Sequence, residues 1–124
     1  MHRTATRIVA VILLVTAVLN ARAHHSFAEF DSTKLVSIEG EVQELRLINP
    51  HSALLIKVAQ QDGSVAEWRV ELGAPVALRR RGVTVGSLPP GTSVNVSGFQ
   101  ARDGTLRLAP RRIALGDGRE FAYE

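Results

Sequence analysis

Short runs of alternating apolar and polar residues constrain this chain more than any other feature of its sequence. In residues 36–42 and again in residues 66–72, every second position is apolar or glycine, and the positions between are polar or charged. A period of two places successive side chains on opposite faces of a strand, so that one face is buried. The pairs Asp62–Gly63 and Asp103–Gly104 are typical of tight turns between such strands. The sequence therefore predicts an all-β domain.

Five strands and one short helix account for the pattern. We expect the strands at residues 36–47, 52–58, 66–72, 94–99 and 106–108. The helix is expected from Val76 to Arg81, because Pro75 stands at its start and Gly82 lies just past its end. Three strands, a helix and two further strands is the order of a small five-stranded OB-type barrel, with the helix between strands three and four. A small open sandwich is the alternative.

Two of the expected strands contain a residue that disturbs them. In the first strand the apolar phase slips after Gly40, since Leu45 is out of step with the residues before it, and this predicts a bulge or a sharp bend. In the fifth, Pro110 limits the strand to a sheet edge or to a break before Ile113. The two arginines at residues 111–112 then follow on an edge, where charged side chains oppose aggregation.

The first 23 residues have the parts of a secretory signal peptide. A basic start precedes Ile8 to Leu19, a twelve-residue run in which Thr16 is the only residue that is not apolar. Ala21 and Ala23 occupy the −3 and −1 positions of a signal-peptidase site. A retained membrane anchor is the alternative, but an anchor normally needs about 20 apolar residues. We therefore expect a periplasmic or secreted protein that meets the membrane only through its transient signal peptide.

Removal of the signal peptide at residues 1–23 leaves a neutral chain of one domain. The leader holds three arginines and no acidic residue, so that 12 of the 15 basic residues remain beside all 12 acidic ones. A neutral chain with few aromatic residues does not favour nucleic-acid binding, and no nucleic-acid partner is expected. We expect an N-terminal arm at residues 24–34 and one OB-like β-barrel domain at residues 35–124.

Cleavage after Ala23 creates a free amine on His24, and the functional hypothesis starts from this group. His24 then offers an amine and an imidazole on one residue, a chelate that suits the tetragonal field of Cu(II). His25 offers a second mode, in which the amine, the intervening amide nitrogen and the imidazole bind copper in one plane. His51, on the turn that contains residues 49–50, would complete an arrangement that resembles a histidine brace. Because the chain has no cysteine, any metal site must use nitrogen and oxygen ligands.

We therefore predict that three histidines share one transition-metal ion, and these are His24, His25 and His51. Copper is expected first, with nickel or zinc as alternatives, because imidazole and amine nitrogens accept all three metals. The weaker candidates for a carboxylate ligand or a supporting hydrogen bond are Glu29, Asp31 and Glu39. The alternative interpretation is that the paired histidines are an accident of the cleavage site.

Metal sequestration or delivery is the predicted function. The sequence has no glycine-rich phosphate loop, nucleophile elbow or HExxH motif, which favours a binding protein over an enzyme. A non-catalytic envelope adaptor for a protein, peptide or glycan is the first alternative, and a copper oxidase or oxygenase built on a brace is the second. The arginine cluster at residues 79–81 is assigned to the helix end, where basic side chains complement the helix dipole, and a contact with an anion is the alternative.

Several motifs together resemble a family of small exported bacterial proteins of uncharacterised function. They are a His-His-Ser-Phe start after an alanine, a Glu-Gly-Glu-Val strand, an Asn-Pro-His turn, a Trp-x-x-Glu strand before Gly-x-Pro, and a Pro-Gly-x-x-Val-x-Val-x-Gly segment. Here they occupy Ala23 to Phe27, Glu39 to Val42, Asn49 to His51, Trp68 to Glu71 with Gly73 and Pro75, and Pro90 to Gly98. The resemblance covers nearly the whole mature chain. It implies export and the extent of the domain, and it implies no reaction.

Overall fold

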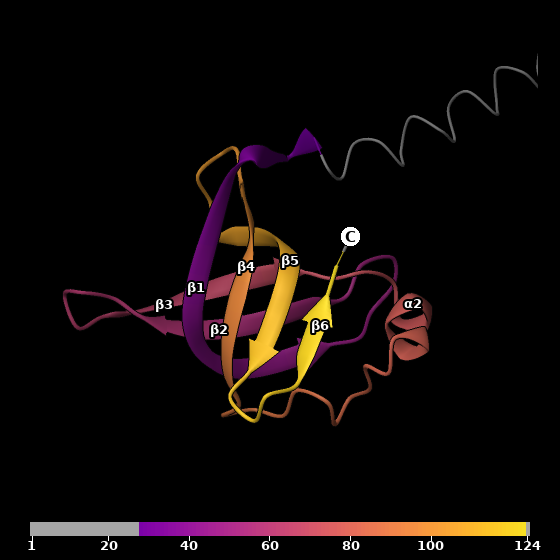
Figure 1. Ribbon diagram of the computed structural model, residues 1–124. Coiled ribbons are helices and arrows are strands. Elements are labelled where there is room, and N and C mark those ends of the chain that lie inside the picture. The colour runs from indigo at the N-terminus through magenta and orange to yellow at the C-terminus, as the bar shows by residue number, and fades with distance from the viewer. Residues whose placement is uncertain (1–27, 124) are drawn as a thin grey trace, which may run out of the picture.

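The computed structural model describes residues 28–123, and the predicted signal peptide, His24 and His25 lie outside these residues. Six strands and one helix make up the described chain (Figure 1). In chain order they are β1 Phe30–Arg46, β2 Ala53–Ala59, β3 Val65–Glu71, α2 Pro75–Arg80, β4 Ser93–Ala101, β5 Arg107–Leu115 and β6 Glu120–Ala122. The prediction of an all-β domain with one short helix between the third and fourth strands is therefore confirmed for this part of the chain.

The strands form one sheet that closes on itself. The hydrogen-bonded order is β3-β2-β1-β4-β5-β6, and an additional parallel pairing joins β3 to β5. Strand β1 is long and curved, so it pairs with β2 through one half and with β4 through the other (Figure 1). The parallel pairing is short, with Arg69 opposite Arg107 and Val70 opposite Leu108. These two residue pairs, which we call the β3–β5 seam, close a ring of five strands.

A sixth strand and an earlier start of β1 depart from the sequence prediction. Strand β6 adds three residues to the edge of β5, where the sequence predicted no strand, because three residues are too few to show an alternating pattern. Strand β1 begins at Phe30, so the last five residues of the expected arm at residues 24–34 belong to a strand. Phe30 is buried and pairs with Ala101 of β4, although the register shifts before Leu35.

A bulge in β1 confirms the expected irregularity after Gly40. The register against β2 shifts between Val42 and Glu44. Gly40 itself lies against the neighbouring strand, because a Cβ atom at this position would stand 2.2 Å from the carbonyl oxygen of Lys57. A glycine here allows the two backbones to approach closely.

Pro110 lies inside a continuous strand, so of the two alternatives that the sequence left open, the break in the strand before Ile113 is wrong. The register between β4 and β5 shifts at this point: Gly98 faces Pro110, whereas Ser97 faces Arg112. Arg111 is therefore the extra residue of a bulge. The shift moves the buried positions from Leu108 to Ile113, which explains why the apolar pattern changes phase across the proline. A bulge also accommodates a residue that has no amide hydrogen.

Asp-Gly turns connect β2 to β3, β4 to β5 and β5 to β6. The Oδ1 atoms of Asp62, Asp103 and Asp117 each accept a hydrogen bond from the backbone amide two residues later, at 2.9–3.0 Å. These hydrogen bonds, together with those from the side chains two residues on, lower the pKa of all three carboxyl groups. The glycine that follows each aspartate has a positive φ, between 79° and 90°, which suits glycine best. The predicted turns are thus confirmed.

The core fills the interior of the ring. Its most deeply buried side chains include Leu54, Ile56, Val70, Leu108 and Ile113, all 0% exposed. The helix and the loop after it cover one end of this core with Leu78, Val83 and Leu88. Trp68 is partly buried and packs against the cluster, as its place in the alternation predicts.

Helix α2 has the predicted boundaries to within one residue. Pro75 stands at its first turn, and Gly82 ends it with a φ of 81°. The amide of Val83 then donates to the carbonyl of Leu78 at 3.0 Å, which turns the chain back onto the core. Among residues 28–123, no helix has the length and apolar character required to cross a membrane.

Candidate functional site

His51 is the one predicted metal ligand that lies among the described residues. It is exposed and follows a cis peptide between Asn49 and Pro50. Its neighbour Ser52 is fully buried and pairs with the end of β3: the Ser52 amide donates to the Gly73 carbonyl at 3.1 Å, and the Leu72 amide donates to the Ser52 carbonyl at 2.8 Å. The backbone next to His51 is thus fixed beside β3.

His51 also lines an open cavity of about 930 Å³, which we call the seam cavity. The cavity lies where β3 and β5 separate beyond their two paired residues. Its outline comes from seven parts of the chain, with the lining residues Glu29, Phe30, Ser32, His51, Arg69, Glu71, Leu72, Gly73, Ala77, Leu78, Arg81, Phe99, Arg107, Ala109, Pro110, Arg111 and Tyr123. The seam residues Val70 and Leu108 point into the core, so their neighbours Arg69 and Arg107 face outward into this cavity.

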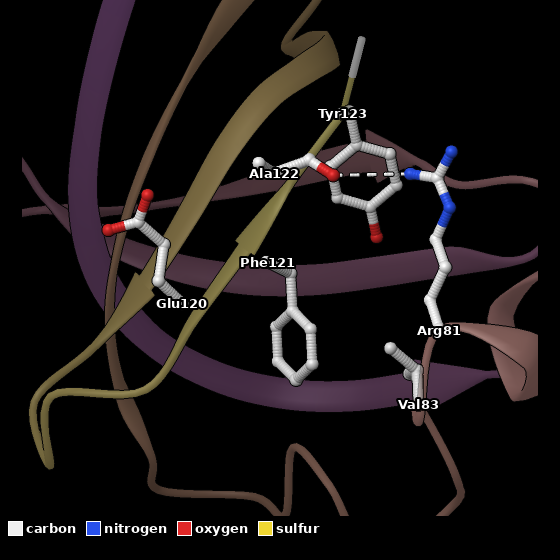
Figure 2. A pocket seen from close by; sticks show the side chains of 6 residues that line it. All are labelled: Arg81, Val83, Glu120, Phe121, Ala122 and Tyr123. Carbon is white, nitrogen blue, oxygen red and sulfur yellow. Dashed lines mark hydrogen bonds between the residues drawn. The ribbon is translucent and has the colours of Figure 1, made fainter.

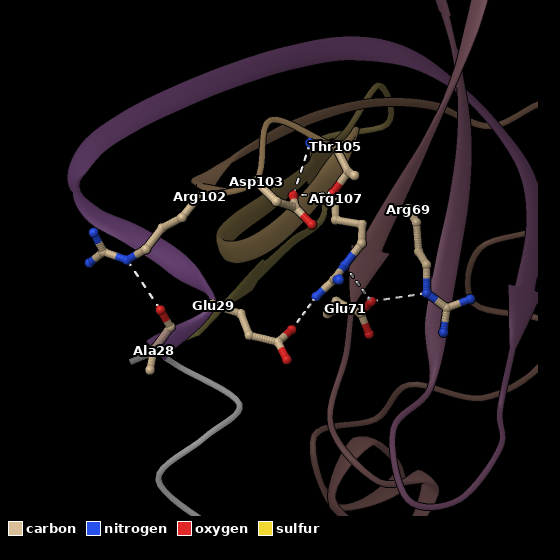
Figure 3. A network of polar contacts seen from close by, with 8 residues as sticks. All are labelled: Ala28, Glu29, Arg69, Glu71, Arg102, Asp103, Thr105 and Arg107. Carbon is tan, nitrogen blue, oxygen red and sulfur yellow. Dashed lines mark hydrogen bonds and ion pairs between the residues drawn. The ribbon is translucent and has the colours of Figure 1, made fainter.

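A chain of ion pairs crosses the seam cavity (Figure 3). Arg107 reaches from β5 to Glu29 at the start of the described chain, and its Nε atom lies 3.5 Å from Oε1 of Glu71. Arg69 donates from its Nε atom to the same Glu71 oxygen at 3.0 Å. The hydrogen bond to Glu29 raises the pKa of Arg107, so this guanidinium stays protonated. The Nε atom of Arg107 is buried and has no hydrogen-bond partner among the described residues.

The same network holds the beginning of the described chain at the rim of the cavity. The Arg102 amide donates to the Glu29 carbonyl at 2.8 Å, and the Arg102 side chain donates to the Ala28 carbonyl at 3.1 Å (Figure 3). The turn that contains Arg102 is closed by Asp103 and Thr105. The chain therefore enters the described fold beside the cavity that His51 lines.

Three arginine–aromatic pairs stand around the seam cavity. Arg107 lies 5.4 Å from the ring centre of Phe30, Arg111 lies 6.0 Å from that of Phe99, and Arg81 lies 5.2 Å from that of Tyr123. All six residues line the cavity. Each ring attracts and orients a guanidinium through its electron-rich face, and it leaves the positive charge of the group in place.

The described residues do not by themselves form a metal site. No group of three histidine, cysteine or acidic side chains within residues 28–123 could hold an ion. The carboxylates that the sequence offered as weaker candidates have other partners or positions: Glu29 pairs with Arg107, Asp31 accepts hydrogen bonds from Thr33, and Glu39 is exposed on β1. The structure thus brings Glu29 and His51 to one cavity and leaves Asp31 and Glu39 elsewhere.

Two arginine clusters divide between different roles, which the sequence did not predict. Arg79 and Arg80 lie in the last turn of α2, as expected, but Arg81 turns toward Tyr123. Arg112 pairs with Glu120 at 2.6 Å on the strand edge, whereas Arg111 lines the seam cavity. The available signal was the alternation of β5, yet the bulge at Arg111 made it unreadable without the tertiary structure.

A second, smaller cavity of about 350 Å³ lies between β6 and the end of α2 (Figure 2). Its walls are Arg81, Val83 and residues 120–123. The guanidinium of Arg81 donates to the Ala122 carbonyl at 3.2 Å and lies beside the Tyr123 ring (Figure 2). The Arg81–Tyr123 pair therefore forms part of the walls of both cavities.

Burial raises the pKa of Tyr123 above its ordinary value of 10.0, and the nearby charge of Arg81 opposes this shift. The folded protein thus keeps the phenol neutral at a pH where the unfolded chain ionises it. The stabilisation of the fold that comes from the neutral phenol is complete below about pH 10 and is lost as the pH rises through the pKa of Tyr123 in the folded protein. We expect denaturant titrations at about pH 8 and about pH 11 to show a smaller loss of unfolding free energy in Tyr123→Phe than in the parent. An equal loss in both proteins would contradict the assignment to Tyr123.

Comparison with known protein families matches the chain to a family that has no characterised activity. Residues 11–108 match the model of a family described as a family of unknown function, DUF6152. The matched segment includes the paired histidines, the turn with His51 and the β3–β5 seam. No curated protein matches the chain.

Proposed function

We propose that this chain, which belongs to DUF6152, a family of unknown function, is an exported copper-binding protein that sequesters or delivers the metal. In the proposal, the signal peptide at residues 1–23 is removed and the protein acts in the periplasm or outside the cell. The ligands are His24, His25 and His51, with the amine of His24 as a further nitrogen donor. Nickel and zinc are the alternatives to copper.

The position of His51 relative to the entry of the chain is the observation that carries this proposal. Glu29 and His51 line one cavity, and Arg102 fixes the backbone at Ala28 and Glu29. Three peptide steps separate His25 from Ala28, and an extended chain covers at most about 3.6 Å per residue. Covalent linkage therefore limits the distance between His25 and Ala28 to about 11 Å, and the proposal is that the chain bends toward His51 within this limit.

The chemistry of the donors favours copper among the divalent metals. An amine, an amide nitrogen and imidazoles form a nitrogen-rich, tetragonal set, and Cu(II) heads the affinity order of first-row divalent ions. The positive charges of Arg69 and Arg107 oppose a cation nearby, but Glu29 and Glu71 offset them. A site at the rim, near His51, meets this balance better than a site among the arginines at the seam.

An OB-type barrel is the architecture that we propose for residues 30–123. Two observations support it: the closed order of pairings through β1, β2, β3, β5 and β4, and the position of α2 between β3 and β4. In such a barrel the long first strand serves both halves of the ring. The described fold would then act as a rigid support for His51, the third ligand of the proposed site.

A copper titration tests the proposal. The exported protein, with its N-terminus confirmed by mass spectrometry, is titrated with Cu(II), and electron paramagnetic resonance is recorded on the 1:1 complex. We expect an axial, nitrogen-rich signal that changes in His51→Ala, and affinity at least about tenfold weaker when one alanine precedes His24. Lys57→Ala, an exposed change on β2, serves as the matched control and is expected to leave the signal unchanged. Weak binding, or a signal indifferent to His51→Ala, would overturn the shared site.

A non-catalytic envelope adaptor is the second candidate, and the open seam cavity favours it. Such a domain would bind a protein, peptide or glycan through its surface and would not need the histidines. Replacement of His24, His25 and His51 together separates the two candidates. The copper proposal expects this triple variant to lose copper binding and, with it, the protein's function in the cell. The adaptor proposal expects the triple variant to keep both partner capture and that function.

A further inference from the structure

We infer that the seam cavity binds a small carboxylate that carries an apolar tail. The inference concerns the arginine side of the cavity and uses neither the paired histidines nor a metal ion. It therefore stands or falls separately from the copper proposal. Three features carry it, and these are the uncompensated charge, the apolar floor and the size of the cavity.

Positive charge prevails in the cavity. Four arginines and two glutamates line it, and the glutamates are both paired with Arg107 or Arg69. Neither Arg81 nor Arg111 forms an ion pair with a carboxylate among residues 28–123. Both are held over aromatic rings, which restrict the side chains without neutralising them. The guanidinium groups of Arg81 and Arg111 therefore keep their positive charge and favour the binding of an anion.

Apolar surface lies directly beside these charges. The rings of Phe99 and Tyr123 support the two arginines, and Leu72, Ala109 and Pro110 line the cavity between the strands. A hydrated inorganic anion gains nothing from such a floor, whereas an apolar chain loses its contact with water there. The combination fits an amphipathic anion better than phosphate or sulfate.

The headgroup and the size of the ligand can be inferred from the arginines and the volume of the cavity. A guanidinium presents parallel N–H donors that suit the two oxygens of a carboxylate, and such pairs are roughly twice as strong as neutral hydrogen bonds. The cavity volume of about 930 Å³ is within the range of small-molecule sites. The bulge at Arg111 is of the kind that redirects a side chain next to a binding site.

Decanoate is the probe for this site, with acetate and decan-1-ol as matched compounds that lack the tail or the charge. The purified protein, with its N-terminus determined by mass spectrometry, is studied in the presence of a chelator so that no metal takes part. Binding is measured by calorimetry and by amide chemical shifts. We expect decanoate to bind and to shift amides of residues 71–73, 99, 109 and 111, and we expect acetate and decan-1-ol to bind at least about tenfold more weakly.

Neighbouring arginines supply the control variants. Arg111→Gln and Arg81→Gln are expected to weaken decanoate binding about tenfold each. Arg112→Gln and Arg80→Gln remove the same charge one residue away, outside the cavity lining, and are expected to change the affinity less than about twofold. Equal binding of acetate or of decan-1-ol would overturn the inference, and so would equal effects of the two sets of variants. Shifts confined to residues outside the cavity would also overturn it.

Discussion

Gly98→Ala is expected to destabilise the fold by about 3 kcal/mol, because there is no space for a side chain at this position. A Cβ atom on Gly98 would stand 2.2 Å from the carbonyl oxygen of Ala109 and 2.9 Å from Cδ2 of Leu108. The first of these atoms is backbone, so relief requires β4 and β5 to move apart at the bulge that places Arg111. Because most domains are stable by only about 5–15 kcal/mol, the loss is a large part of the total.

Gly86→Ala is the matched control for this substitution. Gly86 lies in the loop before β4 and has no positive φ, and a Cβ atom added there would meet no other atom within 4 Å. We expect its unfolding free energy to stay within about 0.5 kcal/mol of the parent or to rise slightly, since alanine restricts the unfolded chain. Denaturant titration of both variants provides the measurement. A loss in Gly98→Ala no larger than in Gly86→Ala would contradict the close approach of β4 and β5.

Leu108→Ala is expected to cost about 2–5 kcal/mol, the range for removal of a fully buried leucine. Leu108 is 0% exposed and faces Val70 in the parallel pairing that closes the ring. The substitution leaves a void under the seam cavity, next to the two residue pairs that hold β3 against β5. It should therefore increase amide exchange first at residues 69–70 and 107–108, where the pairing is shortest.

Leu106→Ala provides the comparison, because the same side chain is removed two residues earlier. Leu106 is 40% exposed and precedes β5, so its loss is expected to change the unfolding free energy by less than about 1 kcal/mol. The pair separates burial at the seam from the general effect of a shorter side chain. Similar losses in the two variants would show that the β3–β5 seam does not depend on Leu108.

Both stability predictions concern the part of the fold that shapes the candidate site. Gly98 lies against β5 from the β4 side, and Leu108 of β5 pairs with β3 on the other side; the outward residues of β5 form one wall of the seam cavity. A variant that loosens the seam should weaken decanoate binding without removal of any contact residue. Measurements of binding in the Gly98→Ala and Leu108→Ala proteins must therefore be made where both remain folded.

Local patterns in the sequence were enough to predict β1 to β4, the start of β5 and the helix, but they missed β6 and the continuation of β5 past Pro110. Alternation predicted the strands, Asp-Gly pairs predicted the turns, and Pro75 with Gly82 located α2 to within one residue. The slip in phase also predicted the bulge after Gly40. These features depend on neighbours within a few residues, so the rules of side-chain periodicity and turn conformation were sufficient. The sequence likewise proposed His51, and the terminal histidines, as candidates for a metal site.

The meeting of distant segments, in contrast, depended on the closed fold. The parallel pairing of Arg69 with Arg107 joins strands that no local pattern connects, and the seam cavity beside it is lined by seven parts of the chain. The bulge at Arg111 carries β5 past Pro110 and separates the roles of two adjacent arginines. Such contacts follow from closure of the ring, because the free energy of each pairing depends on the other strands already in place. The order of the elements predicted a barrel, but charge, alternation and spacing along the chain did not specify which residues of β3 and β5 would pair.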